Sequence, residues 1–454
     1  MSSPPQSSLS PSPLDTLARE LDLVGTGAAM HAFAAALQPI PRSLTGNGVR
    51  ATLAAIGERI PLVVHEVPTG APVLDWTIPR EWNLRSAWIK GPSGETVVDA
   101  VDSPLHVVGY SVPVRVLLPL AELQEHLYSL PEYPDRVPYR TSYWRETWGF
   151  CLPHQRRAAL PEGEYEVLID ATLADGALTY GECFLPGETA REVLISTHVC
   201  HPALANDNLS GLALATFLAE RLAAVPRHYS YRFLFVPGTI GAITWLARNE
   251  DAAARIDHGL VVANVGDSGG FHYKRSLRGD AAIDRAVPQA LAAIGETVAV
   301  EDFVPFGYDE RQYCSPGFDL PVGSLTRTPW GRYPEYHTSA DDLTFIRPEA
   351  LAGSLRAYLA VAALLESNAR RGAYRRYRNL APKGEPQLGR RGLYASLGGT
   401  TSGRERELAL LWILNQSEGR HDLLAIAERA GMPLEAIAEA AEALSVAGLL
   451  SRLD

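Results

Sequence analysis

Two residues in the segment Thr197–Gly211 have the type and setting of metal ligands. His198 ends an apolar run that predicts a buried strand, and groups just beyond the carboxyl ends of strands face the ligand crevice in open α/β sheets. Asp207 follows in a polar loop directly before a predicted helix, where a carboxylate caps the helix or binds a cation. The segment therefore predicts two metal ligands, with a buried structural histidine and a helix cap as the alternatives.

A third candidate ligand, His337, lies far downstream in a polar loop that ends in acidic residues. A neutral imidazole there would bind a metal, and a nearby carboxylate would orient its ring, although a helix cap is again the alternative. Two imidazoles and one carboxylate suit zinc and leave one coordination position open. We therefore predict that His198, Asp207 and His337 bind zinc. His201 could replace or supplement His198, but Pro202 beside it indicates a role in the turn.

A hydrolytic zinc site also needs a carboxylate that accepts a proton from water. Glu310, in a polar run between apolar segments, is the first candidate, and Glu335 and Asp309 follow it. The alternative role of Glu310 is an ion pair with an arginine in a surface loop. Asp267 lies after another predicted strand and is a candidate for a further metal ligand, but its Gly-rich surroundings fit equally a tight turn.

Arginine and tyrosine side chains near these positions are candidates for substrate binding. Arg311, like Arg327 and Arg332, could pair a terminal carboxylate in a bidentate manner. Tyr313 and Tyr336 could form the wall of a pocket, with ordinary packing between domains as the competing explanation.

The elements that must position these side chains form an alternating pattern of apolar runs and helical periodicities. Alternation of this kind predicts an α/β fold with a mainly parallel sheet that is covered by helices. Strands are expected at Glu166–Asp170, Val193–Thr197, Tyr231–Val236 and Leu260–Val265, and helices at Leu209–Ala224, Ile240–Asn249 and Pro348–Ser367.

The composition and hydrophobic pattern of the sequence change several times along the chain, and these changes predict the domain organisation. Residues 1–13 are rich in Ser and Pro and are expected to be a disordered tail. Residues 14–60 are helical in pattern and join 167–385 in the α/β domain, while 61–166 have short β-like runs and predict an inserted β-rich domain. Residues 386–454 contain a linker and three short helical patterns, the layout of a winged-helix-like domain.

Composition narrows the classes of function. No apolar run reaches the roughly 18 residues that a membrane helix needs, so no membrane partner is expected. The four cysteines form no CxxC pair, which argues against a disulfide framework and favours a reducing cytoplasm. The net charge of −11, and nine acidic against five basic residues from Arg404 onward, disfavour nucleic acid as a partner. The apolar residues of the C-terminal domain instead predict a homo-oligomer contact.

Several of these motifs, taken together, resemble a known family. The order of His198, Asn206–Gly211 and Tyr336–Thr338 resembles the metal-binding landmarks of the aminopeptidase-like clan of zinc exopeptidases. A closer resemblance is to bacterial aminopeptidase-like proteins that carry a small inserted β domain and a C-terminal winged helix. This resemblance implies a zinc-aminopeptidase-like fold, and it implies relatives linked to the assembly of polysaccharides or specialised metabolites. It rests on the phrases Thr141–Pro153, Ser196–Gly211, Asp309–Cys314 and Pro334–Leu343.

The sequence departs from that clan at two places. The clan's Glu-Glu pair, which supplies a general base and a metal ligand, is replaced by Gly238 and Thr239. The Asp of its His-x-Asp motif is replaced by Cys200. Neither Gly238 nor Thr239 can do the work of a carboxylate, so the departures weaken the expectation of a two-zinc peptidase.

The sequence thus predicts a zinc-dependent hydrolase of an amide bond, acting on a peptide-like or aminoacyl small molecule. The first alternative is a catalytically inactive homologue that binds a metal or ligand, which the loss of the Glu-Glu pair favours. A weaker alternative is a helix-turn-helix regulator.

Overall fold

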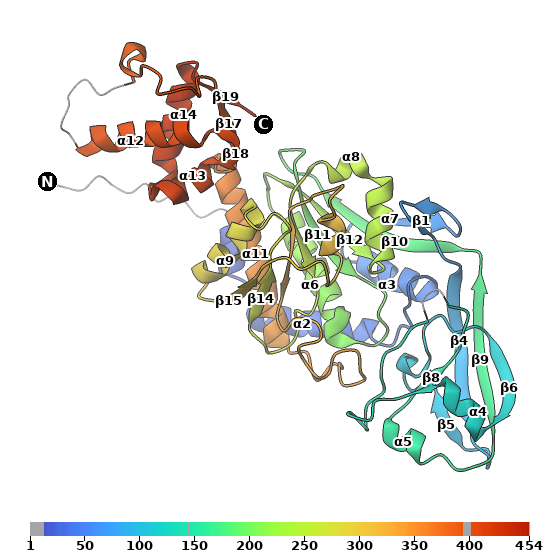
Figure 1. Cartoon of the computed structure of the whole chain (residues 1–454). Coiled ribbons are helices and arrows are strands. Elements are labelled where there is room, and N and C mark those ends of the chain that lie inside the picture. Colours follow the sequence, from blue (N-terminus) through green and yellow to red (C-terminus); the bar gives the residue numbers. More distant parts are fainter. Residues whose placement is uncertain (1–12, 143–144, 394–400, 454) are drawn as a thin grey trace. The chain divides into compact units, whose positions relative to one another are not determined.

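The computed structural model describes residues 13–142, 145–393 and 401–453, and its contacts divide the chain into two units, 1–363 and 364–454. Pro13 begins the first helix, α1 (Pro13–Arg19), whereas the rest of the predicted N-terminal tail lies outside the described residues. Part of the predicted linker, 394–400, lies outside them as well. Figure 1 traces both units.

A large sheet forms the frame of the first unit. Its eight described strands have the order β1-β10-β12-β11-β13-β16-β14-β15, and the four at the centre, β12 to β16, are parallel. Antiparallel pairs flank this centre on both sides. Four of the seven neighbouring pairs are parallel, so the predicted mainly parallel sheet is confirmed, with antiparallel pairs towards both sides. The strands are β1 (Val63–Pro68), β10 (Ala177–Leu185), β11 (Glu192–His198), β12 (Ser230–Val236), β13 (Ile256–Val262), β14 (Phe271–Lys274), β15 (Val298–Glu301) and β16 (Val322–Thr326).

Helices pack on this sheet because its central strands are apolar on both faces. Every residue of β11, β12 and β16 is buried, so the continuous apolar runs of the sequence correspond to strands that are covered on both sides. Helix α6 packs against β11 and β13, α7 against β10 and β12, α3 against β10, and α9 against β13 and β16. The helices are α2 (Leu23–Leu37), α3 (Asn47–Gly57), α6 (Gly211–Ala223), α7 (Ile240–Arg248), α8 (Glu250–Ala253), α9 (Ala282–Ala293) and α11 (Pro348–Arg370).

Helix α11 is the one described helix that is long and apolar enough to cross a membrane. Of its most apolar window, 78% is buried inside the protein. Long core helices have the same length and composition, so its apolar character is explained by packing.

A second, smaller sheet forms the inserted domain. Its strands have the order β5-β4-β9-β6 and are antiparallel throughout, and Figure 1 shows them as a sheet of their own. Its core contains the buried rings of Trp82, Phe150 and Tyr165. The strands are β4 (Glu81–Lys90), β5 (Thr96–Asp99), β6 (Val114–Pro119) and β9 (Glu164–Ala174).

The boundary between the two sheets differs from the predicted 61–166. The expected strand at Glu166–Asp170 is part of β9 and belongs to the small sheet, not to the large one. Conversely, β1 lies inside the predicted insert but pairs with β10 at the edge of the large sheet. In both strands the pattern of the sequence shows the burial of the strand but not its partner.

Glu81 connects the two sheets through one cluster of hydrogen bonds. Its carboxylate accepts from both Nη atoms of Arg50 in α3, at 2.8 and 2.7 Å, and from the Ala177 amide of β10 at 3.0 Å. Asn83 donates a further hydrogen bond to it. Arg50 holds the pKa of Glu81 down at about 2, although burial opposes this shift. The ionised form of Glu81 therefore stabilises the folded protein.

We expect Glu81→Gln to reduce the free energy of unfolding by about 1–3 kcal/mol at pH 7, because Arg50 loses its charged partner. The folded pKa lies below the ordinary value of 4.5, so this contribution is present above about pH 5 and declines as the pH falls towards 2. Urea unfolding of both proteins at pH 7, 5 and 4 measures it. The more exposed partner of Arg50, Glu66, provides the control, since Glu66→Gln should cost well under half as much. Equal stabilities of wild type and Glu81→Gln at pH 7 would contradict the assignment.

The second unit is a winged-helix domain, as predicted. Three helices, α12 (Thr401–Gln416), α13 (Leu423–Ala430) and α14 (Leu434–Val446), accompany a sheet with the order β18-β17-β19. Asp422 caps α13 by accepting from the Ala425 amide, and Gly431 ends it with a φ of 61°. The turn between α13 and α14 thus follows from a cap and a glycine. The strands are β17 (Arg376–Asn379), β18 (Glu418–Asp422) and β19 (Leu450–Arg452).

Candidate metal centre

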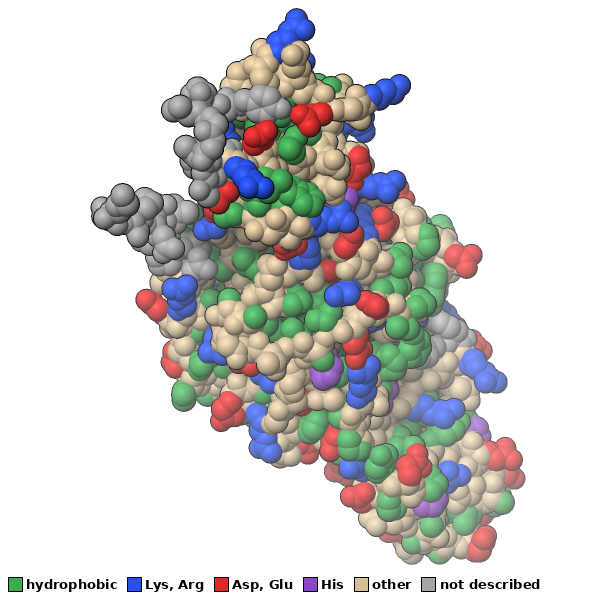
Figure 2. All heavy atoms as spheres, turned by 60° about the vertical axis from the view of Figure 1, so that its left-hand side comes forward, with side chains coloured by type: hydrophobic (Ala, Val, Ile, Leu, Met, Phe, Trp, Pro, Cys, Tyr) green, Lys and Arg blue, Asp and Glu red, His purple; other side chains and the backbone are tan. Residues whose placement is uncertain are grey.

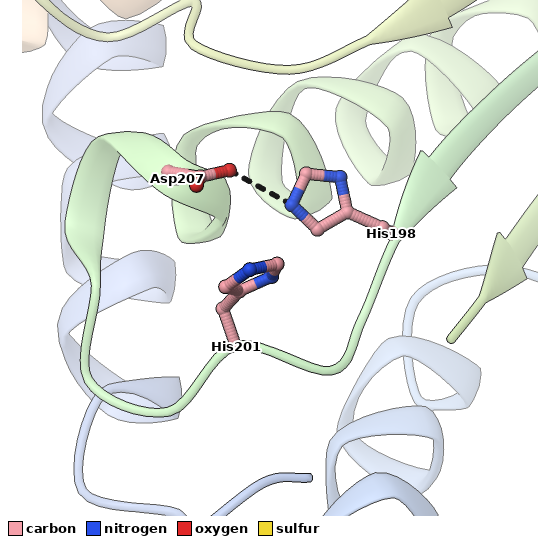
Figure 3. A group of neighbouring side chains, drawn as sticks. All are labelled: His198, His201 and Asp207. Atoms are coloured by element: carbon pink, nitrogen blue, oxygen red, sulfur yellow. Dashed lines mark hydrogen bonds and ion pairs between the residues drawn. The ribbon is translucent and has the colours of Figure 1, made fainter. Parts of the chain in front are cut away.

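The end of strand β11 and the loop that follows it supply most of the candidate site. The strand ends at His198, the chain turns through His201, and Asp207 lies in the irregular helical segment η3 (Ala205–Ser210) before α6. Figure 3 shows the three side chains on one loop, with Asp207 and His198 joined by a hydrogen bond. Because β11 is buried along its whole length, the strand fixes His198 at the carboxyl end of a central strand of the large sheet.

Asp207 is the centre of the cluster. Its Oδ1 lies 2.8 Å from Nε2 of His198, and its Oδ2 lies 3.0 Å from Nε2 of His337. His337 comes from the loop before α11, so the fold brings it to Asp207 from 130 residues away. The structure therefore brings two of the predicted zinc ligands, His198 and His337, into contact with the third, Asp207.

His201 contributes a fourth donor to the same place. Metal-ligating atoms of His198, His201 and Asp207 all lie within 4.8 Å of one another. The His201 ring centroid is 4.7 Å from that of His198 and 5.3 Å from that of His337. The donor atoms of His201 therefore lie in the cluster, which suits the alternative in which His201 supplements His198 as a ligand.

Burial controls the charge of these groups. Burial opposes ionisation of Asp207, but the imidazoles of His201, His198 and His337 hold its pKa well below the usual range. Burial lowers the pKa of His201 to about 3, although Asp207 opposes that shift. At neutral pH the cluster thus offers a carboxylate and an unprotonated His201 ring, which are the forms that bind metals.

Asp341 holds the loop that carries Asp207. Its carboxylate accepts from the backbone amides of Asn206 at 2.6 Å and Asp207 at 3.0 Å, and its carbonyl accepts from Ala205. The acidic residues after His337 were expected to orient the His337 ring. Instead, Asp341 fixes the backbone of the segment that carries Asp207.

Asp267 has a different place from the one expected of a metal ligand. Its Oδ1 accepts from the Gly269 amide and the Thr328 hydroxyl, and its Oδ2 accepts from the Asn206 side chain and the Thr328 amide. The hydrogen bond from the Gly269 amide is the one expected of the tight-turn alternative. A further hydrogen bond joins Asp267 to Asn206, the residue before Asp207. We therefore assign Asp267 to support of the loop and remove it from the ligand set.

Glu310, the first candidate for the general base, forms a buried ion pair. It begins the short helix α10 (Glu310–Tyr313), has only 1% of its surface exposed, and its carboxylate contacts Nζ of Lys274. The alternative expected for Glu310 was an ion pair with an arginine in a surface loop. The observed partner is Lys274, and the Glu310 carboxylate is buried. Glu335, the runner-up, accepts the Thr338 amide through its backbone carbonyl.

Asp309 lies on the side of this loop that faces the cluster. A Cβ atom added at Gly238 would lie 3.2 Å from Cβ of His198 and 3.9 Å from Oδ1 of Asp309. The neighbouring Tyr308 ring stacks on His198 with centroids 5.1 Å apart. Asp309 thus brings a carboxylate to the place where the clan's Glu-Glu pair is missing. Burial raises the pKa of Asp309 to about 7, with His198 and Arg311 opposing the shift and Glu310 adding to it.

The predicted substrate-binding residues separate into two groups. Tyr336 stacks on His337 at 3.9 Å between centroids, and Arg311 donates a long hydrogen bond of 3.4 Å to Thr239, so both lie beside the cluster. Tyr313 is fully buried with its hydroxyl bonded to Ser196, so a substrate cannot reach it. The prediction for Tyr313 is wrong because its apolar ring completes the core under the sheet.

The other two arginines that were considered for carboxylate binding have partners elsewhere. Arg327 donates to the Gly269 carbonyl and the Ser354 hydroxyl, and Arg332 pairs with Glu301.

The donor set fits one zinc ion. Zinc in catalytic sites takes three protein ligands and leaves a fourth position to water, and Asp207 with two of the three imidazoles supplies such a set. A second ion of the clan's type would take a carboxylate ligand from the Glu-Glu pair, and this chain has Gly238 and Thr239 in its place.

Two family models match this chain. The model described as "Domain of unknown function (DUF4910)" matches residues 31–368, and the model described as "winged helix-turn-helix" matches residues 375–452. The first covers more than half of the chain and contains the whole cluster around Asp207.

Known proteins and structures agree with this division. The chain is 48% identical over 419 residues, 92% of its length and 95% of the relative, to "Putative polysaccharide biosynthesis protein with aminopeptidase-like domain" of Clostridium acetobutylicum. A crystal structure of a "putative peptidase" from the same species has a TM-score of 0.78 and 45% identity, covering 97% of this chain and all of that one. A zinc aminopeptidase from Bacillus subtilis has a TM-score of 0.54 at 13% identity, covering 74% and 93%, which shows a common fold.

Proposed function

The chain belongs to the DUF4910 family, with an aminopeptidase-like fold and a C-terminal winged helix, and we propose that it is a zinc-dependent amide hydrolase. One observation carries the proposal: His198, His201 and His337 surround the buried carboxylate of Asp207 at the edge of the sheet. The substrate would be a peptide-like or aminoacyl small molecule. The name of the clostridial relative connects that protein with polysaccharide biosynthesis, so a small conjugate is as suitable a candidate as a peptide.

The residues of this chain would divide the work as follows. Asp207 and two of the three imidazoles would hold the zinc and leave its fourth position to water, and Asp341 would keep Asp207 in place through the backbone amides of Asn206 and Asp207. Zinc bound there would supply Lewis-acid polarisation of a carbonyl and would lower the pKa of water to about 7. Tyr308 and Tyr336, which stack on His198 and His337, would limit the motion of the two rings and exclude bulk water.

Asp309 is the group we propose as general base. Its carboxylate is buried and lies close to Gly238 beside His198. Glu310, in contrast, is engaged with Lys274. The base would therefore come from the loop before α10 and not from the position after β12 where the clan has its glutamates.

The hydrolase proposal is tested with zinc-loaded and chelated protein on a panel of aminoacyl amides, dipeptides and N-acyl amino acids. We expect turnover of at least one class by the loaded protein, loss of turnover after chelation, and recovery on addition of zinc. A protein that binds zinc but turns over no member of the panel would instead support the inactive homologue, the alternative that Gly238 and Thr239 favour.

The winged-helix domain raises the separate question of nucleic acid, and we propose that it contacts another protein chain. Its sequence from Arg404 onward has nine acidic and five basic residues. On the face that Figure 2 shows, charges of both signs are interspersed and form no basic stripe. Leu380, Leu408 and Val446 of this domain are exposed apolar side chains, which would suit a homo-oligomer contact.

We expect no retarded band when the full chain is mixed with random duplex DNA at low salt, because phosphate binding requires clustered basic residues. An electrophoretic mobility shift with a known winged-helix repressor as positive control measures this. A band that disappears between 50 and about 200 mM salt would show electrostatic binding and would revive the regulator hypothesis.

A further inference from the structure

Arg42 is a buried cation whose guanidinium is only partly satisfied. It follows helix α2, and only 2% of its surface is exposed. Its Nε donates to the His201 carbonyl at 3.0 Å, and its Nη1 donates to the Leu37 carbonyl at 2.6 Å. Its Nη2 is buried and has no hydrogen-bond partner among the described residues. One end of the guanidinium thus holds the chain in place, and the other end is free to bind a ligand.

No carboxylate of the described residues pairs with this charge. Its hydrogen-bond acceptors, the carbonyls of His201 and Leu37, are neutral. Burial lowers the pKa of Arg42 to about 10, so the side chain remains a cation at neutral pH. A buried charge without a counter-ion is costly, and proteins retain such a charge where a ligand supplies the partner.

A small cavity of about 10 Å³, enough for one water-sized oxygen atom, is present at the same place. Arg42 and Pro202 line it from the α/β domain, and Trp82, Val107 and Tyr139 line it from the inserted domain. Apart from Arg42, most of this lining is apolar, so an anion in the pocket would interact with the guanidinium in surroundings of low dielectric constant.

Tyr139 connects this pocket to the candidate metal centre. Its ring centroid lies 5.0 Å from that of His201 and 5.0 Å from that of His337. Arg42 itself bonds to the backbone of His201. Tyr139 thus lines the same cavity as Arg42 and contacts two imidazoles of the candidate metal centre.

We propose that Arg42 binds an oxyanion, a carboxylate or a phosphate, of the molecule on which the metal centre acts. The substrate of the proposed hydrolase would then be an acidic amide, with its anionic group in the pocket and its carbonyl at the cluster. This assignment of the substrate class rests on the proposed function, whereas the anion site itself does not. Nη2 carries two N–H groups, and each of them can donate a charge-assisted hydrogen bond to an oxyanion.

Binding of two probes, ¹³C-acetate and inorganic phosphate, tests the anion site by nuclear magnetic resonance. We compare wild type with Arg42→Met, which keeps the apolar stem, and Arg42→Lys, which keeps the charge without the fork. Arg227 offers a matched control, because its Nη1 also donates to two backbone carbonyls, those of Leu222 and Val225. Arg227→Met should bind the probes as wild type does, while Arg42→Met should bind at least about tenfold more weakly and Arg42→Lys in between.

The probe that wild type prefers identifies the group, since acetate points to a carboxylate and phosphate to a phosphate ester. Zinc content and urea unfolding are measured for each variant. Equal binding by wild type and Arg42→Met, or binding of neither probe by wild type, would overturn the proposal. Loss of zinc from Arg42→Met with unchanged probe binding would likewise overturn it, because Arg42 would then act only by positioning His201.

A pair of substrates separates this proposal from the proposed function. An N-acyl amino acid and its carboxamide differ only in the anionic group, and we expect wild type to favour the acid by about 10-fold to 100-fold in kcat/KM. Arg42→Met should lose this preference, mainly through KM for the acid. If wild type binds the probes but cleaves neither compound, the anion site stands and the hydrolase falls. If wild type cleaves both compounds equally, the proposed hydrolase activity is supported and the proposed preference for an acidic substrate is rejected.

Discussion

Replacement of Asp207 by asparagine should remove zinc from the protein and reduce amide turnover by at least about 10³-fold, which is roughly 4 kcal/mol of transition-state stabilisation. Asp207 is the one anionic donor of the cluster, and its two oxygens contact His198 and His337 at the same time. An asparagine keeps the shape of the side chain but offers no negative charge to a cation. Loss of the Asp207 carboxylate should therefore reduce the affinity for zinc more than loss of any one imidazole.

The measurement is zinc per protein chain, by atomic emission, for protein purified without added zinc. We expect close to one zinc for wild type and little for Asp207→Asn, with His198→Ala and His337→Ala between the two. Asp342→Asn provides a control from the same loop as His337, since Asp342 only caps the local turn at Thr344. Equal zinc in wild type and Asp207→Asn would remove the metal centre and the hydrolase with it.

Replacement of Asp309 by asparagine should reduce kcat by about 10²-fold to 10⁴-fold, the usual contribution of a general base. The zinc content should stay the same, because Asp309 lies beside Gly238 and is not one of the proposed zinc ligands. A variant that keeps the metal and loses turnover would thus separate proton transfer from metal binding.

The adjacent Glu310 supplies the control for this prediction. Glu310→Gln breaks an ion pair with Lys274 and should lower stability, but turnover per folded molecule should change by less than about tenfold, well under the loss of a general base. Folded protein is quantified by circular dichroism before each assay. The opposite result, in which Glu310→Gln is inactive and Asp309→Asn is active, would return the base to Glu310.

The contrast between Asp309 and Glu310 shows where sequence reasoning reaches its limit. Both are acidic residues in one polar run, and nothing in their order shows which of them faces the cluster. The choice depends on how α10 begins and on which side of the loop Lys274 approaches. Lys274 lies on β14, an element some 36 positions away in the chain, so local pattern does not contain this information.

Arg42 and His201 illustrate the same limit in another form. The sequence places His201 in a turn and gives no reason to single out Arg42. In the structure, the guanidinium of Arg42 holds the His201 carbonyl, and Tyr139 of the inserted domain lies against the His201 ring. These contacts arise because three segments that are distant in the chain meet at one edge of the large sheet.

The sequence by itself determined the elements whose pattern is set by burial along one segment. Continuous apolar runs are found where strands are covered on both faces, and a cap with a glycine stop defines helix α13. The candidate ligands were also accessible, because each stands at a strand end or in a polar loop. Tertiary structure alone decided that β9 belongs to the small sheet and β1 to the large one, that Asp267 and Tyr313 lie outside the cluster around Asp207, and that Asp309 lies beside Gly238 and His198. The physical reason is that periodicity records how deeply a side chain is buried, whereas its partners depend on the path of the whole chain.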